Sequence, residues 1–195
     1  LVEALAAARA HDATFAAAGV SREAGSEKRW QGLAPLLPQT LFIAPDAPEP
    51  CDLAPFGRQW FSLADRRPEA LLAGVARAAP VLDAYLDGLL AQHGLTADRL
   101  ALLGFSQGTM LALHAAPRRP APLAAVLGYS GALIDDGRLA AEHRSAPPVL
   151  LIHGDADEIV PVAALPAAVA ALQAAGIAVE WSVRPGLATG STPRG

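Results

Sequence analysis

The stretch Leu100-Ala101-Leu102-Leu103-Gly104-Phe105-Ser106-Gln107-Gly108-Thr109-Met110-Leu111 decides the fold. Its first part, Arg99 to Phe105, is apolar at nearly every position, which is typical of a strand buried on both faces of a sheet. The residues from Gln107 to Ala116 have helical spacing, and the five residues centred on Ser106 follow the pattern Gly-x-Ser-x-Gly. A glycine-flanked serine between a buried strand and a helix is typical of a nucleophile elbow in an α/β sheet.

Short apolar runs and longer alanine- and leucine-rich runs alternate along the rest of the chain from about Thr40. The apolar runs predict strands at Thr40 to Ala44, Arg99 to Phe105, Leu123 to Tyr129, Pro148 to His153 and Ile177 to Val183. The longer runs predict helices at Pro68 to His93, Gln107 to Ala116 and Val162 to Ala175, with Pro80 kinking or dividing the first. We therefore expect a single α/β domain with a mostly parallel sheet and helices on both faces.

The N-terminal segment, residues 1–32, does not follow this alternation. It contains an alanine-rich run that predicts a helix, followed by the polar stretch Ser21 to Arg29, and no strand is predicted in it. A sheet of this kind normally begins with strands. We therefore expect the sheet to lack its first strands and this segment to stand apart from the domain.

Composition and charge exclude several classes of protein. Hydrophobic residues make up 52% and charged residues 17%, which is too apolar for a disordered chain. The formal net charge of −4 provides no basic surface for a nucleic acid. No apolar run approaches the roughly 20 residues of a membrane span, and no signal peptide is evident, so we expect a cytoplasmic protein. The single cysteine, Cys51, cannot form an internal disulfide, and the sequence leaves the oligomeric state open.

The predicted elbow supplies two chemical groups for acyl transfer. The Ser106 hydroxyl stands clear at the carboxyl edge of the sheet, where it can act as a nucleophile. The helix that begins at Gln107 directs its backbone N–H groups and the positive end of its dipole towards this position. The Gln107 N–H is therefore the expected first donor to a developing oxyanion.

An acidic loop follows the predicted strand Pro148 to His153. It contains Asp155, Asp157 and Glu158, and functional groups in α/β sheets gather beyond the carboxyl ends of strands. One of these carboxylates could orient a catalytic histidine and stabilise its cation. The residues alone favour equally a second interpretation, in which the acids cap the helix that starts near Pro161.

Separated motifs between Leu33 and Leu187 resemble the phospholipase/carboxylesterase family, relatives of acyl-protein thioesterases with the α/β-hydrolase fold. They are Leu41-Phe42-Ile43-Ala44-Pro45-Asp46-Ala47-Pro48, Gln59-Trp60-Phe61, the elbow around Ser106, and His153-Gly154-Asp155-Ala156-Asp157 with Val160-Pro161. The resemblance implies hydrolysis of carboxylic ester or thioester bonds. It further implies Ser106 as nucleophile, Asp157 as triad acid, Trp60 near the acyl-binding side and His153 as a structural residue.

No cofactor is implied by this resemblance, and no metal is expected, because Asp46, Asp52 and Asp65 are too dispersed to form a ligand cluster. The expected partner is a small-molecule acyl ester or thioester.

Both ends of the chain depart from the family pattern. Nothing in residues 1–32 matches the His-Gly-x-Gly loop that supplies the second oxyanion donor. Thr189 stands where the family places its catalytic histidine, so this histidine is absent. Abundant Ala, Gly, Pro and Arg indicate a GC-rich gene. Deleting one guanine from suitable codons for Gly-His-Gly-Ile-Asp-Pro-Glu-Gly yields the observed residues 188–195, so this tail is interpreted as an out-of-frame reading.

Two functions follow from the sequence. The first is a serine hydrolase of the carboxylesterase or phospholipase type, which acts through an acyl-enzyme. The alternative is a catalytically dead or truncated hydrolase that lacks the triad histidine and acts at most as a binding protein. Of the other histidines, only His153 lies near the expected edge of the sheet.

Overall fold

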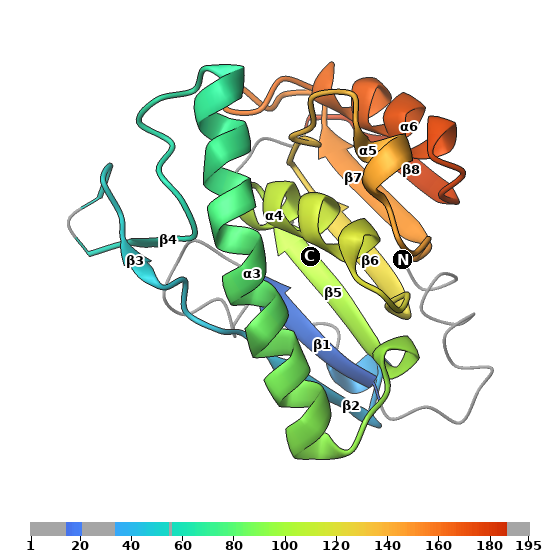
Figure 1. Ribbon diagram of the computed structural model, residues 1–195. Coiled ribbons are helices and arrows are strands. Elements are labelled where there is room, and N and C mark those ends of the chain that lie inside the picture. The colour runs from blue at the N-terminus through green and yellow to red at the C-terminus, as the bar shows by residue number, and fades with distance from the viewer. Residues whose placement is uncertain (1–14, 21–33, 55, 187–195) are drawn as a thin grey trace.

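The computed structural model describes residues 15–20, 34–54 and 56–186. Its main sheet contains six strands, each parallel to its neighbours, in the order β2-β1-β5-β6-β7-β8. Figure 1 shows the sheet crossing the molecule, with β5 and β6 near its middle. The strands are β1 (Phe15–Val20), β2 (Thr40–Ile43), β5 (Leu100–Phe105), β6 (Ala125–Tyr129), β7 (Val149–Gly154) and β8 (Val179–Arg184). All five strands that the sequence predicted are present.

Strand β1 corrects the prediction for the N-terminal segment. Phe15–Val20 lies between β2 and β5 and pairs in parallel with both. The alanine-rich run favours a helix locally, but ladder hydrogen bonds to two neighbouring strands outweigh that small preference. The prediction of no strand within residues 1–32 was wrong. The rest of that segment, residues 1–14 and 21–32, and the tail 188–195 lie outside the described residues.

The α-helices are α3 (Pro68–His93), α4 (Gln107–Ala115), the short α5 (Leu139–Glu142) and α6 (Ala164–Ala174). Helix α3 begins with Pro68 in its first turn and is capped after His93 by Gly94, whose φ of 63° is the left-handed conformation that glycine adopts readily. Pro80 lies inside α3 without dividing it. No helix of the described ranges is long and apolar enough to cross a membrane.

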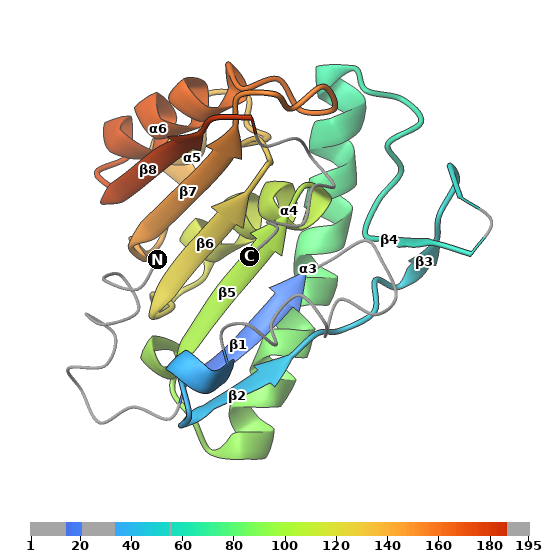
Figure 2. The ribbon, with the colours of Figure 1, turned by 180° about the vertical axis from the view of Figure 1, so that it is seen from behind.

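The main core lies between one face of the sheet and the helices α3, α4 and α6. Its fully buried side chains include Leu82, Leu102 and Leu172. On the opposite face of the sheet, Leu103 and Leu127 form a smaller buried cluster. Figure 2 shows this second face, on which no α-helix of the described residues lies. A helical layer there stays a prediction.

A two-stranded antiparallel hairpin, β3 (Glu49–Pro50) with β4 (Arg58–Gln59), lies apart from the main sheet. The chain leads from β4 into Trp60 and Phe61, which are buried in the main core. Phe61 packs against α3 at Gly74, where an added Cβ would lie 2.7 Å from the Phe61 ring. The absence of a side chain at Gly74 therefore allows this segment to reach the helix.

We predict that Gly74→Ala lowers the free energy of unfolding by about 1–2 kcal/mol, because overpacking against buried Phe61 outweighs the higher helix propensity of alanine. Gly88→Ala is the matched control in the same helix, since a Cβ there meets nothing within 4 Å. It should stabilise the protein by about 0.5–1 kcal/mol. Urea denaturation measures both, and equal effects of the two substitutions would contradict the predicted contact.

Candidate active site

The turn at Ser106 has the strand–turn–helix context that its sequence spacing predicts. Ser106 follows β5 and precedes α4, with φ 51° and ψ −112°, a main-chain conformation that costs a residue with a side chain roughly 1–3 kcal/mol. Its N–H donates to Tyr129 O at 2.8 Å, and its carbonyl accepts the Met110 N–H at 3.2 Å. Strand β6 and the first turn of α4 therefore hold this strained residue from both sides.

Three glycines allow α4 to approach the sheet closely enough to form this turn. An added Cβ on Gly104 would lie 2.4 Å from the Thr109 N, and one on Gly128 would lie 2.6 Å from the Thr109 Cγ2. A Cβ on Gly131 would lie 2.3 Å from the Thr109 Cβ. The Thr109 hydroxyl donates to Tyr129 O and accepts the Tyr129 N–H, both at 2.9 Å. Thr109 thus fastens the helix to β6.

Gln107, the first residue of α4, is completely buried. Its Oε1 accepts the Trp60 N–H at 2.9 Å, and its Nε2 donates to Phe61 O at 2.7 Å. The resemblance placed Trp60 at the acyl-binding side, and the structure places its main chain against the residue that follows Ser106. The Trp60 ring is 3% exposed, and its indole N–H has no hydrogen-bond partner among the described residues.

The three carboxylates of the acidic loop after β7 differ in how deeply they are buried. Asp157 has a fully buried side chain, whose Oδ1 accepts the N–H groups of Ile159 at 3.0 Å and Val160 at 2.9 Å. Asp155 is exposed and accepts the Gly186 N–H, while Glu158 is also exposed. Helix α6 begins later, at Ala164, without a side-chain cap or an acidic residue in its first turn. The helix-capping interpretation therefore receives no support.

His153 lies at the end of β7 and is 1% exposed. Its Nε2 lies 2.8 Å from Val160 O and 3.3 Å from Asp157 Oδ2. With two acceptors beside it, Nε2 is the nitrogen that carries the proton, and it is unsuited to accept one from Ser106. His153 therefore supports the acidic loop, as expected for a structural histidine at a strand end.

Strand order brings the predicted residues to one edge of the sheet. Strands β5, β6 and β7 are consecutive, so Ser106 and Asp157 follow the carboxyl ends of strands two apart. Ser130 follows β6 between them, also with a positive φ, 48°, and donates its N–H to Ile152 O at 2.9 Å. The sequence analysis did not single out Ser130, although a Ser-Gly pair directly after a buried strand indicates a tight turn. Thr189 lies outside the described residues.

No cluster of three His, Cys, Asp or Glu side chains that could hold a metal ion occurs in the described part of the chain. The other described histidines do not reach the Ser106 turn. His114 Nδ1 lies 3.3 Å from Ile134 O, and His143 Nδ1 lies 3.1 Å from Ala140 O. His93 is exposed at the end of α3.

A parallel sheet with a strained serine between β5 and α4 defines an α/β-hydrolase. The chain belongs to the Phospholipase/Carboxylesterase family, whose model matches residues 28–194. It is 32% identical over 143 residues to esterase YpfH of Escherichia coli, an alignment that covers 73% of this chain and 60% of YpfH. It is 38% identical over 95 residues to acyl-protein thioesterase 1 of Schizosaccharomyces pombe, covering 45% of this chain and 40% of that protein.

Among solved structures, esterase PE8 is similar, with a TM-score of 0.85 and 39% identity over 91% of this chain and 85% of PE8. Zea mays acyl-protein thioesterase 2 has a TM-score of 0.66 and 25% identity over 93% of this chain and 88% of that one. The chain spans 60% of the length of esterase YpfH and 40% of that of the Schizosaccharomyces pombe thioesterase.

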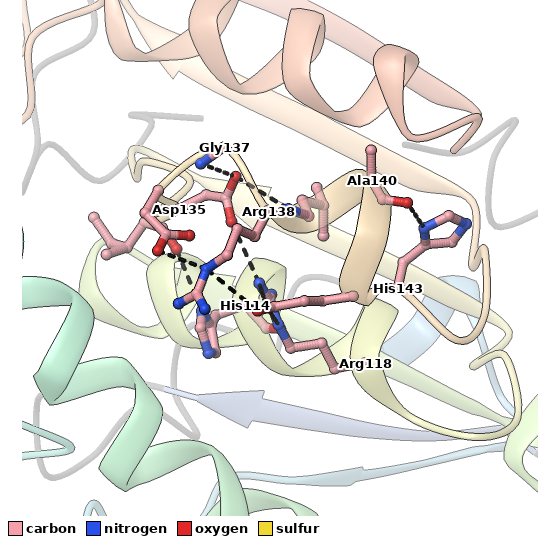
Figure 3. A network of polar contacts seen from close by, with 11 residues as sticks. His114, Arg118, Asp135, Gly137, Arg138, Ala140 and His143 are labelled. Atoms are coloured by element: carbon pink, nitrogen blue, oxygen red, sulfur yellow. Dashed lines mark hydrogen bonds and ion pairs between the residues drawn. The ribbon is translucent and has the colours of Figure 1, made fainter.

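A second polar cluster, shown in Figure 3, lies at the C-terminal end of α4. The Arg118 guanidinium donates to His114 O at 2.8 Å, to Glu142 Oε2 at 2.8 Å and to Asp135 Oδ1 at 3.3 Å. Asp135 also accepts the N–H groups of Gly137 and Leu139. These bonds tie α4 to the segment between β6 and α5. Burial, together with the Arg118 charge, lowers the pKa of His114 below its ordinary value of 6.5.

The lowered pKa of His114 gives stability a pH dependence with a definite sign. The folded state keeps His114 neutral where the unfolded state binds a proton, so the free energy of unfolding should fall as pH falls below about 6.5. His114→Asn keeps a donor near Ile134 O and removes this titration. For this variant, the slope of the free energy of unfolding against pH should be smaller than for the wild type, by up to about 1.4 kcal/mol per pH unit.

Urea denaturation at several values between pH 5 and pH 8 measures this slope. Gln92→Asn, at an exposed position near the end of α3, removes no titratable group and is the control, which should keep the wild-type slope. Equal slopes for the wild type and His114→Asn would show that His114 does not titrate as its environment predicts.

Proposed function

We propose that this chain is a serine hydrolase that cleaves carboxylic ester or thioester bonds through an acyl-enzyme. The observation that carries the proposal is the strained main chain at Ser106, which holds a hydroxyl at the carboxyl edge of the sheet beside the N-terminus of α4. Strain of this kind persists only where the surrounding packing enforces it, and it concentrates at functional sites. The names of the relatives, esterase and acyl-protein thioesterase, support the same reaction class.

In the proposed reaction, the Ser106 Oγ attacks the acyl carbonyl carbon and passes its proton to the histidine that the resemblance places at position 189, where this chain has Thr189. The carbonyl oxygen becomes an oxyanion, which accepts a hydrogen bond from the Gln107 N–H. The histidine then gives the proton to the departing alkoxide or thiolate, which leaves as an alcohol or thiol. Water attacks the acyl-enzyme in the same way and releases the acid. Asp157 orients the histidine and stabilises its cation.

The base is the part of this machinery that the chain lacks at the family position, where Thr189 stands. A threonine hydroxyl cannot accept a proton at neutral pH as an imidazole does. We propose that residues 188–195 replace the histidine-bearing segment and limit the turnover of this chain. A catalytically inactive protein that retains the domain for binding is the alternative that Thr189 itself favours.

We predict that the double substitution Ala188→Gly/Thr189→His raises kcat/KM for p-nitrophenyl acetate by at least about 100-fold, the usual contribution of a general base. Adding Ser106→Ala or Asp157→Asn to this variant should remove most of the gain. Hydrolysis is followed by release of p-nitrophenolate at pH 8.

The matched control is Ser145→Ala, added to the double variant. Ser145 is buried at the opposite end of α4 from Ser106, where its hydroxyl makes a long bond of 3.4 Å to Ala116 O. It should leave the rate unchanged. If Ser106→Ala does not reduce hydrolysis by the wild type or the double variant, the proposed function is wrong.

A further inference from the structure

The Gln107 side chain forms hydrogen bonds with Trp60 and Phe61, which lie 47 and 46 residues before it in the sequence. Both ends of its amide are used, and both partners are main-chain groups of consecutive residues, Trp60 N–H and Phe61 O. The side chain is completely buried. A buried amide is costly when either end lacks a partner, so the side chain and the segment Trp60–Phe61 constrain each other.

The segment Trp60–Phe61 is not part of the main sheet. It follows strand β4, which pairs with β3 in a hairpin separate from the main sheet (Figure 2). Apolar burial holds the rings of Trp60 and Phe61, but apolar contacts are non-directional. The two hydrogen bonds to Gln107 are directional, and they fix where the main chain of this segment lies relative to the elbow.

Gln107 is also the residue whose backbone N–H meets the oxyanion in the proposed reaction. The oxyanion and the acyl chain are attached to the same carbon atom of the substrate. A segment that is bonded to the Gln107 side chain is therefore well placed to border the acyl chain. Trp60 is the large, uncharged side chain of this segment, and such a side chain suits an apolar acyl group.

We propose that the Gln107 side chain is a positioning residue, which sets the Trp60–Phe61 segment as a wall of the acyl-binding site and thereby tunes selectivity for acyl length. The inference rests on the proposed function, since it concerns the acyl group of the same substrate. It assigns to the Gln107 amide a role separate from that of its backbone N–H.

The first test measures acyl binding without turnover, in the Ser106→Ala background. Adding Gln107→Met keeps a side chain of similar length and removes both hydrogen bonds. The Kd for p-nitrophenyl octanoate should rise by about 10-fold or more, whereas that for p-nitrophenyl acetate should change by less than about 2-fold. Amide hydrogen exchange at Trp60 should accelerate in the same variant, because its N–H loses its acceptor.

Gln107→Glu, in the same background, separates positioning from a general loss of structure. When protonated, the new carboxyl can accept from Trp60 N–H and donate to Phe61 O, as the amide does. When ionised, it cannot donate, and it repels the Phe61 carbonyl. Burial raises the pKa of such a carboxyl, so octanoate affinity should match the Ser106→Ala parent at pH 5.5 and fall to that of Gln107→Met at pH 8.5.

Ser145→Ala is the control for loss of a buried polar side chain away from Ser106. Ser145 is 8% exposed, and its hydroxyl lies 3.4 Å from Ala116 O. It should leave the octanoate-to-acetate ratio of Kd values unchanged at both pH values.

An unchanged ratio in Gln107→Met, or a pH-independent ratio in Gln107→Glu, would overturn the positioning role. So would unchanged exchange at Trp60. Failure of the proposed function would be seen differently, as hydrolysis that Ser106→Ala does not reduce.

Discussion

The close contact between the first turn of α4 and strands β5 and β6 is the constraint on which the rest of the site depends. Thr109 lies where Cβ atoms on Gly104, Gly128 or Gly131 would collide with it, and its hydroxyl bonds both main-chain groups of Tyr129. This packing leaves the chain no room for an ordinary turn between β5 and α4. Ser106 consequently adopts its positive φ, and its side chain is set at the edge of the sheet.

The same contact orders the neighbouring parts of the site. Because α4 begins directly after Ser106, Gln107 is buried against the segment that follows β4, and its amide reaches Trp60 and Phe61. Phe61 in turn packs on α3 at Gly74. On the other side of Ser106, β6 and β7 lead to the loop in which Asp157 is buried beside His153. Contacts of α3, α4, β6 and β7 thus hold the residues around Ser106.

Much of the fold could be predicted because strands buried in a parallel sheet form continuous apolar runs. The elbow could be predicted because its glycines are required by close contacts. Strand β1 could not, since Phe15–Val20 is alanine-rich and becomes a strand only through pairing with β2 and β5. The burial that distinguishes Asp157 from Asp155 and Glu158 arises from tertiary packing, which the loop sequence does not show. The Gln107 bonds join residues too far apart in sequence for any local pattern to indicate.

The most direct test of this account compares the stabilities of Ser106→Gly and Ser106→Ala by urea denaturation. At an ordinary position, a glycine variant has a free energy of unfolding about 0.5–1 kcal/mol lower than that of the alanine variant, because glycine gives the unfolded chain more conformational freedom. At a strained positive φ, removing the Cβ relieves roughly 1–3 kcal/mol. The account predicts that Ser106→Gly is the more stable variant by about 1 kcal/mol. A more stable Ser106→Ala would contradict it, because the elbow would then not be the strained turn from which the site is built.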